Sequence, residues 1–231
     1  AAVQFIEKSK DGPFLLFLSH YSVHTPIQAR GQDVAQYTDR LKELGLPIDV
    51  KLRPEKYGNT RMTQNNPAFA AMVASVDRSV GKVLGKLREL GMEGDTLVVF
   101  TSDNGGLSTR PAKRVAPTSC LPLRAGKGWL YEGGVRVPTI VSWPGVTKPG
   151  SVSPVPVVTT DFYPTLLAAA GLPLRPAQHL DGVDLTPLLK GGNIGARNLY
   201  WHYPHYHGSA NRPSASVRKG DYKLVRWYED G

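Results

Sequence analysis

The amino-acid sequence predicts an α/β fold, in which helices flank a mainly parallel sheet and a small antiparallel subdomain follows at the carboxyl end. Two unbroken apolar runs, residues 13–19 and 96–102, are typical of strands that are buried on both faces. A long segment of helical periodicity, residues 66–91, lies between them and completes a strand–helix–strand unit. Short strand-like segments near the carboxyl end predict the antiparallel part.

Composition and charge narrow the class of protein. The 231 residues are 41% hydrophobic and 20% charged, which suits a globular chain of one large domain, or of one domain and a small one. No apolar run approaches the roughly 18 residues of a membrane-spanning helix, so we expect no membrane span. The net charge of +9 is spread along the chain without a Lys/Arg block, which favours anionic ligands and argues against nucleic acid.

The amino-terminal part predicts a helix end, a strand and a long polar stretch. Residues 1–10 have the pattern of the end of an amphipathic helix, and we expect the chain to be cut from a longer protein. The apolar run 13–19 then leads into a loop that contains two histidines. Residues 28–64 are polar and broken by Gly and Pro, so we expect a long loop with short helical pieces, of a kind that is often functional.

The middle of the chain predicts a long helix before the second strand. Asn66 and Pro67 are typical of an N-cap and of the first helical position, and Gly91 is typical of a helix end. Apolar residues recur between them at helical spacing: Phe69, Met72, Val73, Val76, Val80, Val83, Leu84, Leu87 and Leu90.

The carboxyl-terminal part predicts a strand, a helix and three short strands. Residues 135–143 form the strand candidate, and Asp161 is expected to cap a helix that Gly171 ends. The short strands follow a Pro/Gly-rich connection, and the last two are joined by a hairpin turn: residues 199–203, 215–218 and 222–227. We therefore expect two parts, an α/β part over 1–190 and an antiparallel subdomain over 191–231.

Asp103 and Asn104 directly follow the apolar run 96–102, and Gly105 and Gly106 follow them. Ligand sites in open α/β sheets lie just beyond the carboxyl ends of the strands, and a carboxylate beside an amide oxygen suits a hard cation such as Ca²⁺ or Mg²⁺. The same four residues are also good turn formers, and on the tetrapeptide alone the turn is the better explanation. The rest of the chain reverses that preference.

Several motifs, in an order that covers nearly the whole chain, together resemble the type I sulfatases of the alkaline-phosphatase-like superfamily. They are Ser19-His20-Tyr21-Ser22-Val23-His24-Thr25-Pro26, Ser102-Asp103-Asn104-Gly105-Gly106, Leu123-Arg124-Ala125-Gly126-Lys127-Gly128, Tyr131-Glu132-Gly133-Gly134-Val135-Arg136-Val137-Pro138 and the bacterial-type ending Arg218-Lys219-Gly220-Asp221-Tyr222-Lys223-Leu224. The resemblance implies the alkaline-phosphatase-like fold and the hydrolysis of sulfate esters.

The resemblance also implies roles for four residues. Asp103 and Asn104 match two ligands of a divalent cation, usually Ca²⁺ with Mg²⁺ as the alternative, which polarises the ester. Lys127 matches a lysine that contacts the sulfate, and the glycines on both sides of it favour this role over that of a solvated loop lysine. His24 matches a histidine that assists the leaving alcohol, although a histidine next to proline is by itself more often structural.

Members of the resembled family begin with a segment that this sequence lacks. That segment carries an acidic metal-binding pair and the residue matured to formylglycine, so we expect the formylglycine there and expect the isolated chain to be inactive. Residues Cys120 to Arg124 fit the Cys-x-Pro-x-Arg pattern from which formylglycine is made. They lie after the Asp-Asn pair and close to Lys127, which is the wrong place, so we expect no formylglycine at Cys120.

A second cluster of polar residues lies near the carboxyl end, among aromatic side chains: His202, His205, His207 and Arg212. Aromatic rings with histidine and arginine suit a sugar, through stacking and hydrogen bonds to hydroxyls. A surface-packed strand end explains the same pattern about equally well. A zinc site is disfavoured because the sequence offers neither a cysteine ligand nor a regular histidine spacing there.

The sequence thus predicts the carboxyl-terminal portion of a sulfatase that acts on a sulfated carbohydrate or another sulfate ester. A phosphatase or phosphodiesterase of the same superfamily is the first alternative, and the single metal-binding pair argues against it. A non-catalytic, sulfatase-like binding module is the second alternative. Similar bacterial proteins are exported, so the resemblance implies a periplasmic or secreted location.

Overall fold

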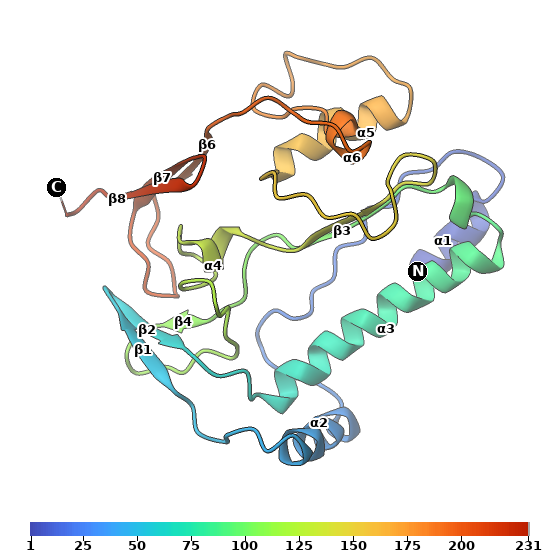
Figure 1. Cartoon of the computed structure of the whole chain (residues 1–231). Coiled ribbons are helices and arrows are strands. Elements are labelled where there is room, and N and C mark those ends of the chain that lie inside the picture. Colours follow the sequence, from blue (N-terminus) through green and yellow to red (C-terminus); the bar gives the residue numbers. More distant parts are fainter. Residues whose placement is uncertain (231) are drawn as a thin grey trace. The chain divides into compact units, whose positions relative to one another are not determined.

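The computed structural model describes residues 1–230, and the chain divides into two compact units (Figure 1). The first unit contains Ala1–Glu93, Thr101–Pro138 and the chain from Leu199 onward, and the second contains Gly94–Phe100 and Thr139–Asn198. No helix in residues 1–230 is long and apolar enough to cross a membrane. The boundary that the sequence predicts at residue 190, between an α/β part and an antiparallel subdomain, stays a prediction.

The first unit contains one long helix, α3, and three shorter helices, of which α1 and α2 lie against α3. Their bounds are α1 Ala2–Ser9, α2 Gly31–Glu43, α3 Pro67–Glu89 and α4 Glu132–Val135. Helices α1 and α2 both pack on α3 (Figure 1). Ion pairs support both contacts, since Lys86 lies 2.8 Å from Glu7 of α1 and Arg78 lies 2.7 Å from Asp33 of α2.

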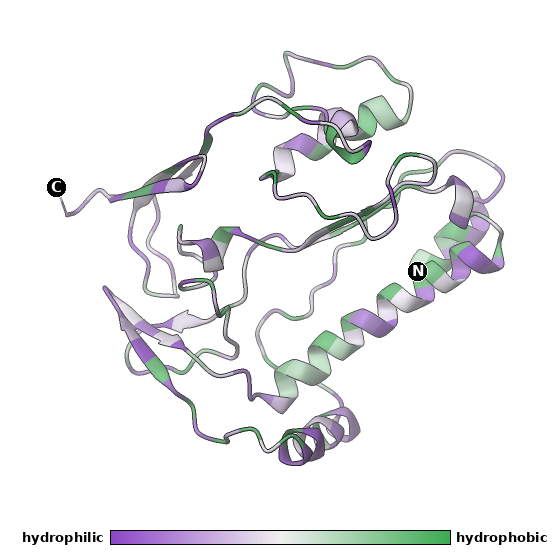
Figure 2. Ribbon diagram, in the orientation of Figure 1, coloured by the Kyte–Doolittle hydropathy of each residue, from purple (hydrophilic) through white to green (hydrophobic). Residues whose placement is uncertain are grey.

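Helix α3 confirms the strongest expectation drawn from the sequence. The Asn66 side chain accepts a hydrogen bond from the Phe69 backbone N–H at 3.2 Å, and Gly91 adopts a left-handed conformation after the helix end. The apolar stripe is less buried than expected, because Val73 and Leu84 are exposed. Figure 2 shows hydrophobic and hydrophilic residues mixed along α3, in contrast with the mainly hydrophilic α2.

The expectation of a loop with short helical pieces over residues 28–64 was wrong in two respects. The stretch contains the full helix α2, and it ends in an antiparallel hairpin that continues into a third strand: β1 Leu52–Glu55, β2 Gly58–Arg61 and β4 Thr109–Arg110. The hairpin lacks apolar alternation because polar side chains fill its interior. Buried Thr60 and Thr109, for example, share a hydrogen bond of 2.8 Å.

The antiparallel carboxyl-terminal sheet confirms the three strands expected from the sequence. Its strands follow one another in the order of the chain: β6 Leu199–Tyr203, β7 Ser214–Lys219 and β8 Tyr222–Trp227. Gly220 makes the last turn in a left-handed conformation. Glu132 of α4 pairs with Arg218 at 3.5 Å and with Lys223 at 3.0 Å, so the segment before Pro138 is fixed to this sheet.

The strand expected over residues 13–19 does not form. Leu15 and Phe17, which alternate along this run, are 75% and 89% exposed. A strand exists only when a neighbour accepts and donates its backbone hydrogen bonds. No strand in residues 1–230 pairs with this run, so its apolar pattern is present without the sheet that the pattern predicts.

The second unit contains a strand pair, β3 Val98–Thr101 with β5 Thr139–Ser142. The last residue of β3, Thr101, belongs to the first unit. The pair confirms strands within both predicted runs, 96–102 and 135–143. Burial on both faces, expected for residues 96–102, was wrong, since Phe100 is 40% exposed. Ile140 of β5 is 60% exposed. Each strand has only one neighbour among the described residues, so part of its surface stays uncovered.

The expected helix after Asp161 is α5, Phe162–Ala169, but the Asp161 side chain does not cap it. Its carboxylate is fully buried and accepts hydrogen bonds from the backbone N–H groups of Val158 at 2.8 Å and Val183 at 3.0 Å. Arg197 pairs with it from the other side. Asp161 belongs to η2 Thr159–Asp161, which precedes α5, and its contacts fix the Pro/Gly-rich connection after α5, which contains α6 Thr186–Leu189. A buried carboxylate needs such a guanidinium and several donors.

Candidate functional site

Three loops of the first unit carry most of the residues singled out by the sequence. We call residues 102–108 the cation loop, 123–134 the lysine loop and 203–213 the histidine loop. The backbone N–H of Lys127 donates to the Gly106 carbonyl oxygen at 2.9 Å, and that of Gly105 donates to the Gly134 carbonyl oxygen at 3.0 Å. The structure therefore ties Asp103 and Asn104 to the same framework as Lys127.

Glycine is required where the cation loop and the lysine loop meet. A Cβ atom on Gly105 would lie 1.7 Å from the Gly133 carbonyl oxygen, and one on Gly126 would lie 2.2 Å from the Gly106 carbonyl oxygen. Real Cβ contacts are never this short, so side chains at these positions would force the backbones apart. The Gly-rich motifs noticed in the sequence thus serve close backbone packing.

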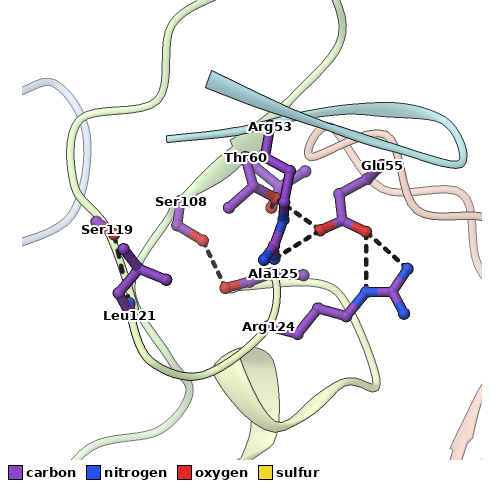
Figure 3. Close-up of polar contacts among 9 residues, drawn as sticks. Arg53, Glu55, Thr60, Ser108, Ser119, Leu121, Arg124 and Ala125 are labelled. Carbon is purple, nitrogen blue, oxygen red and sulfur yellow. Dashed lines mark hydrogen bonds and ion pairs between the residues drawn. The ribbon is translucent and has the colours of Figure 1, made fainter. Parts of the chain in front are cut away.

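Glu55 of β1 binds the lysine loop through Arg124, as Figure 3 shows. Its side chain is 1% exposed and pairs with Arg53 at 3.1 Å and with Arg124 at 2.9 Å. The Arg124 guanidinium also lies over the Tyr131 ring, 3.9 Å from the ring centre. No sequence pattern indicates this contact, because Glu55 lies in a polar hairpin 69 positions before Arg124.

The histidine loop is attached to the lysine loop through Trp129. This tryptophan is 1% exposed, and its indole N–H donates to the Ser209 carbonyl oxygen at 2.9 Å. Gly128 is left-handed, and a Cβ atom there would lie 2.2 Å from Nδ1 of His207. His207 therefore lies directly against the residue that follows Lys127.

The surroundings of His207 favour the neutral form of its ring. Burial lowers the pKa of His207, and the nearby cations Lys127 and Arg110 lower the pKa further. The Ser209 backbone N–H donates to Nδ1 at 3.1 Å, so Nδ1 is an acceptor and the proton of the neutral ring sits on Nε2. His207 thus offers an N–H donor beside two positive charges.

The four residues of the predicted carboxyl-terminal cluster do not act as one group. His207 and Arg212 line a cavity of about 520 Å³, together with Tyr57, Tyr206 and Glu229. The His205 ring packs on Tyr203 at 5.4 Å. His202 lies on the opposite face of β6 from Tyr203, with its ring 6.0 Å from that of Tyr228.

His24 is held by its own loop. Its side chain is exposed, Nδ1 donates to the Thr25 carbonyl oxygen at 2.9 Å, and the ring lies 5.3 Å from that of Tyr21. Within residues 1–230, no hydrogen bond, ion pair or ring contact joins His24 to the cation loop or the lysine loop. Its role at the leaving oxygen therefore stays a prediction.

Asp103 and Asn104 fit part of a cation shell. Asp103 is exposed and Asn104 half-buried, and in residues 1–230 neither side chain makes a hydrogen bond or ion pair. The Asn104 backbone carbonyl oxygen accepts from the Ser102 hydroxyl at 2.9 Å, which fixes the turn. Two free oxygen donors suit a hard cation, but Ca²⁺ takes six to eight ligands. No group of three or more His, Cys, Asp or Glu residues suited to a metal exists in the described chain.

Cys120 has a structural role in this framework. Its thiol donates to the Gly106 carbonyl oxygen at 3.3 Å, so it helps to hold the cation loop. Burial raises the pKa of the Cys120 thiol, which suppresses the reactive thiolate. The expectation that no formylglycine forms at Cys120 stays a prediction.

Comparisons with known proteins cover the whole chain. The profile of the sulfatase family matches residues 1–172, and that of the N-sulphoglucosamine sulphohydrolase C-terminal region matches residues 125–231. A sulfatase of Formosa agariphila is 36% identical over 100% of this chain and 41% of its own length. Human arylsulfatase A is 36% identical over 93% of this chain and 36% of its own length.

Solved structures agree with these matches. The crystal structure of Ps i-CgsB in complex with k-i-k-neocarrahexaose is 31% identical, with a TM-score of 0.76 over 99% of this chain and 45% of that one. The PsFucS1 sulfatase from Pseudoalteromonas sp. is 27% identical, with a TM-score of 0.68 over 96% of this chain and 38% of that one. These likenesses confirm the predicted fold class. The chain spans less than half the length of each of these four relatives.

Proposed function

Because the chain belongs to the sulfatase family, we propose that the full-length protein hydrolyses sulfate esters and that its substrate is a sulfated carbohydrate. The observation that carries this proposal is the backbone framework that joins Asp103 and Asn104 to Lys127. The carbohydrate is supported by Ps i-CgsB, a 31% identical protein whose crystal structure contains neocarrahexaose.

Asp103 and Asn104 would hold the divalent cation, which we propose to be Ca²⁺. The family implies this cation and a formylglycine, which together polarise the sulfate and supply the nucleophile. We place the formylglycine outside residues 1–231 and not at Cys120, whose buried thiol supports the cation loop. The remaining cation ligands would also come from outside this chain, so the isolated residues 1–231 are expected to show no turnover.

Lys127 and His24 would act on opposite ends of the ester bond. The Lys127 ammonium neutralises charge on the sulfuryl oxygens, and its position is set in advance by the lysine loop. His24 would pass the Nε2 proton of its doubly protonated ring to the departing alcohol, which leaves a neutral ring whose Nδ1 still donates to the Thr25 carbonyl oxygen.

The test is hydrolysis of 4-nitrophenyl sulfate and 4-nitrophenyl phosphate by the full-length protein. We expect preference for the sulfate ester and a loss of about 10²- to 10³-fold in kcat with Lys127→Ala or Asp103→Ala. The matched control is Lys113→Ala, since Lys113 is an exposed lysine outside the three loops. Preference for the phosphate ester, or ordinary rates in both loop variants, would contradict the proposal.

A further inference from the structure

We propose that the cavity lined by Tyr57, Tyr206, His207, Arg212 and Glu229 binds an uncharged sugar ring next to the ring that carries the sulfate. This inference rests on the proposed function. We call the cavity the ring subsite. Its volume of about 520 Å³ falls within the roughly 300–1,000 Å³ of small-molecule sites.

Aromatic surface is the first feature that suits a sugar. Tyr206 is 70% exposed and Tyr57 is half-buried, and both line the ring subsite. The C–H faces of a pyranose are apolar and pack against aromatic rings, whereas its edges carry hydroxyls. The Arg212 guanidinium lies over the Tyr57 ring, 4.2 Å from the ring centre, and the Trp129 ring stacks on Tyr57 at 6.5 Å. The aromatic face left for a sugar is therefore that of Tyr206.

The charges of the ring subsite offset one another. Arg212 pairs with Glu229 at 3.1 Å, and the Tyr206 hydroxyl donates to the same carboxylate. A guanidinium has five N–H donors and a carboxylate about four acceptor positions, so this pair keeps spare capacity on both sides. Such a mixture matches sugar hydroxyls, which both donate and accept, and the Arg212–Glu229 pair itself carries no net charge.

The side of the ring subsite that His207 lines is close to the positive charges of Lys127 and Arg110. His207 lines the cavity, packs against Gly128 and feels the charges of Lys127 and Arg110. The positive charge of Lys127 suits the sulfate, while the balanced pair Arg212–Glu229 suits a neutral ring. We therefore expect the bound saccharide to run from the sulfate at Lys127 to the neighbouring ring at Arg212 and Glu229.

Tight contacts around the β1–β2 hairpin fix the walls of the ring subsite. A Cβ atom on Gly58 would lie 2.5 Å from the Arg110 carbonyl oxygen and 3.0 Å from the Ala210 side chain. The Tyr57 hydroxyl donates to Asp230 at 2.8 Å. A site with preset walls loses little conformational entropy on binding.

The experiment compares two substrates of the full-length protein: a sulfated neocarrahexaose and 4-nitrophenyl sulfate. The aryl ester has no neighbouring sugar, so only the hexasaccharide can use the ring subsite. We expect Tyr206→Ala and Arg212→Ala to lower the ratio of kcat/KM for the hexasaccharide to that for the aryl ester by about tenfold, mainly through KM. Tyr222→Ala is the matched control, because Tyr222 is 85% exposed and lies outside the cavity.

The outcomes separate this inference from the proposed function. Failure of the wild-type protein to hydrolyse 4-nitrophenyl sulfate would overturn the proposed function, and the ring subsite with it. Hydrolysis of the aryl ester with no preference for the hexasaccharide would overturn the ring subsite alone. Equal losses on both substrates would also overturn it. Thermal melting of each variant shows that a change in ratio does not come from unfolding.

Discussion

The lysine loop and the loop that carries His24 belong to the same compact unit, yet they are held in opposite ways. The lysine loop is joined to the cation loop by backbone hydrogen bonds, to the hairpin by Glu55 and to the histidine loop by Trp129. The polar contacts of the His24 ring come from its own loop, and nearby Phe17 is 89% exposed. The lysine loop is thus tied to three other segments of the described chain, whereas the loop that carries His24 is tied to α3 by a hydrogen bond of 2.9 Å between His20 Nε2 and the Ser79 hydroxyl.

This difference shows which site residues are positioned by contacts within the described chain. Residues that contact each other within the chain, such as Gly126 and Gly106, set the position of Lys127. The apolar run before His24 has no neighbouring strand among the described residues, and relatives such as the Formosa agariphila sulfatase are more than twice as long as the matched part. We expect the position of His24 to depend on chain outside residues 1–231.

The largest effect is expected from Gly126→Ala in the full-length protein. A Cβ atom there would lie 2.2 Å from the Gly106 carbonyl oxygen and 2.3 Å from the Ser108 hydroxyl, so the two loops must separate. We expect a loss of about 3 kcal/mol in the free energy of unfolding, with loss of turnover. Urea unfolding and an aryl sulfate assay measure both.

Gly81→Ala is the matched control for this substitution. Gly81 lies within α3, and a Cβ atom there would meet nothing within 4 Å. We expect this change to stabilise the protein by about 0.5–1 kcal/mol, because alanine is the better helix former. Equal behaviour of the two variants would contradict the close packing of the loops.

A smaller effect is expected from Arg124→Ala. This change leaves Glu55, whose side chain is 1% exposed, with Arg53 as its remaining ion-pair partner. Because Arg124 is half-exposed, we expect a loss of only about 1–2 kcal/mol in the free energy of unfolding. Arg88→Ala is the control, since its ion pair with Glu93 is exposed on both sides and is expected to contribute less to stability than the pair of Arg124 with Glu55. Equal urea midpoints for the two variants would contradict the role of Glu55.

The titration of His207 tests the contact between the lysine loop and the histidine loop. Lys127 is one cause of the lowered pKa of His207, so Lys127→Ala should raise this pKa toward its ordinary value of about 6.5. In the wild-type protein the neutral ring stabilises the fold above pH 6.5 or so, and this contribution is lost as the pH falls, because the unfolded chain binds the proton first. NMR of labelled histidine rings measures the pKa, and an unchanged value in Lys127→Ala would show that the two loops are apart.

The smallest effect is expected at Cys120. Its pKa is raised by burial, so iodoacetamide should modify it slowly at pH 7 and faster as the pH rises. Cys120→Ala should keep activity within about twofold, because the lost contact is one weak hydrogen bond from sulfur. An aldehyde at residue 120 in the mass spectrum of the tryptic peptide, or loss of activity in this variant, would contradict the assignment.

Local chemistry explains which features could be predicted from the sequence. The N-cap at Asn66 and the glycines around Lys127 depend on neighbouring residues, and their patterns correctly indicated a helix and a tight loop. Residues 13–19 can form a strand only beside a partner strand, so the apolar pattern alone predicts a strand that the structure lacks. The contact of Glu55 with Arg124 joins positions 69 apart and leaves no local signal. The local pattern at Asp161 predicts a helix cap, because its partner Arg197 lies 36 positions away and leaves no local signal.

The most direct test of the central claim is a crystal structure of the full-length protein with Ca²⁺ and inorganic sulfate. We expect an Asp103 or Asn104 oxygen to lie about 2.3–2.6 Å from the cation, and Lys127 Nζ to lie about 3 Å from a sulfate oxygen of the same site. The lysine loop should keep its hydrogen bond from Lys127 to Gly106. A cation and sulfate bound together elsewhere, with Asp103, Asn104 and Lys127 contacting neither, would contradict the central claim.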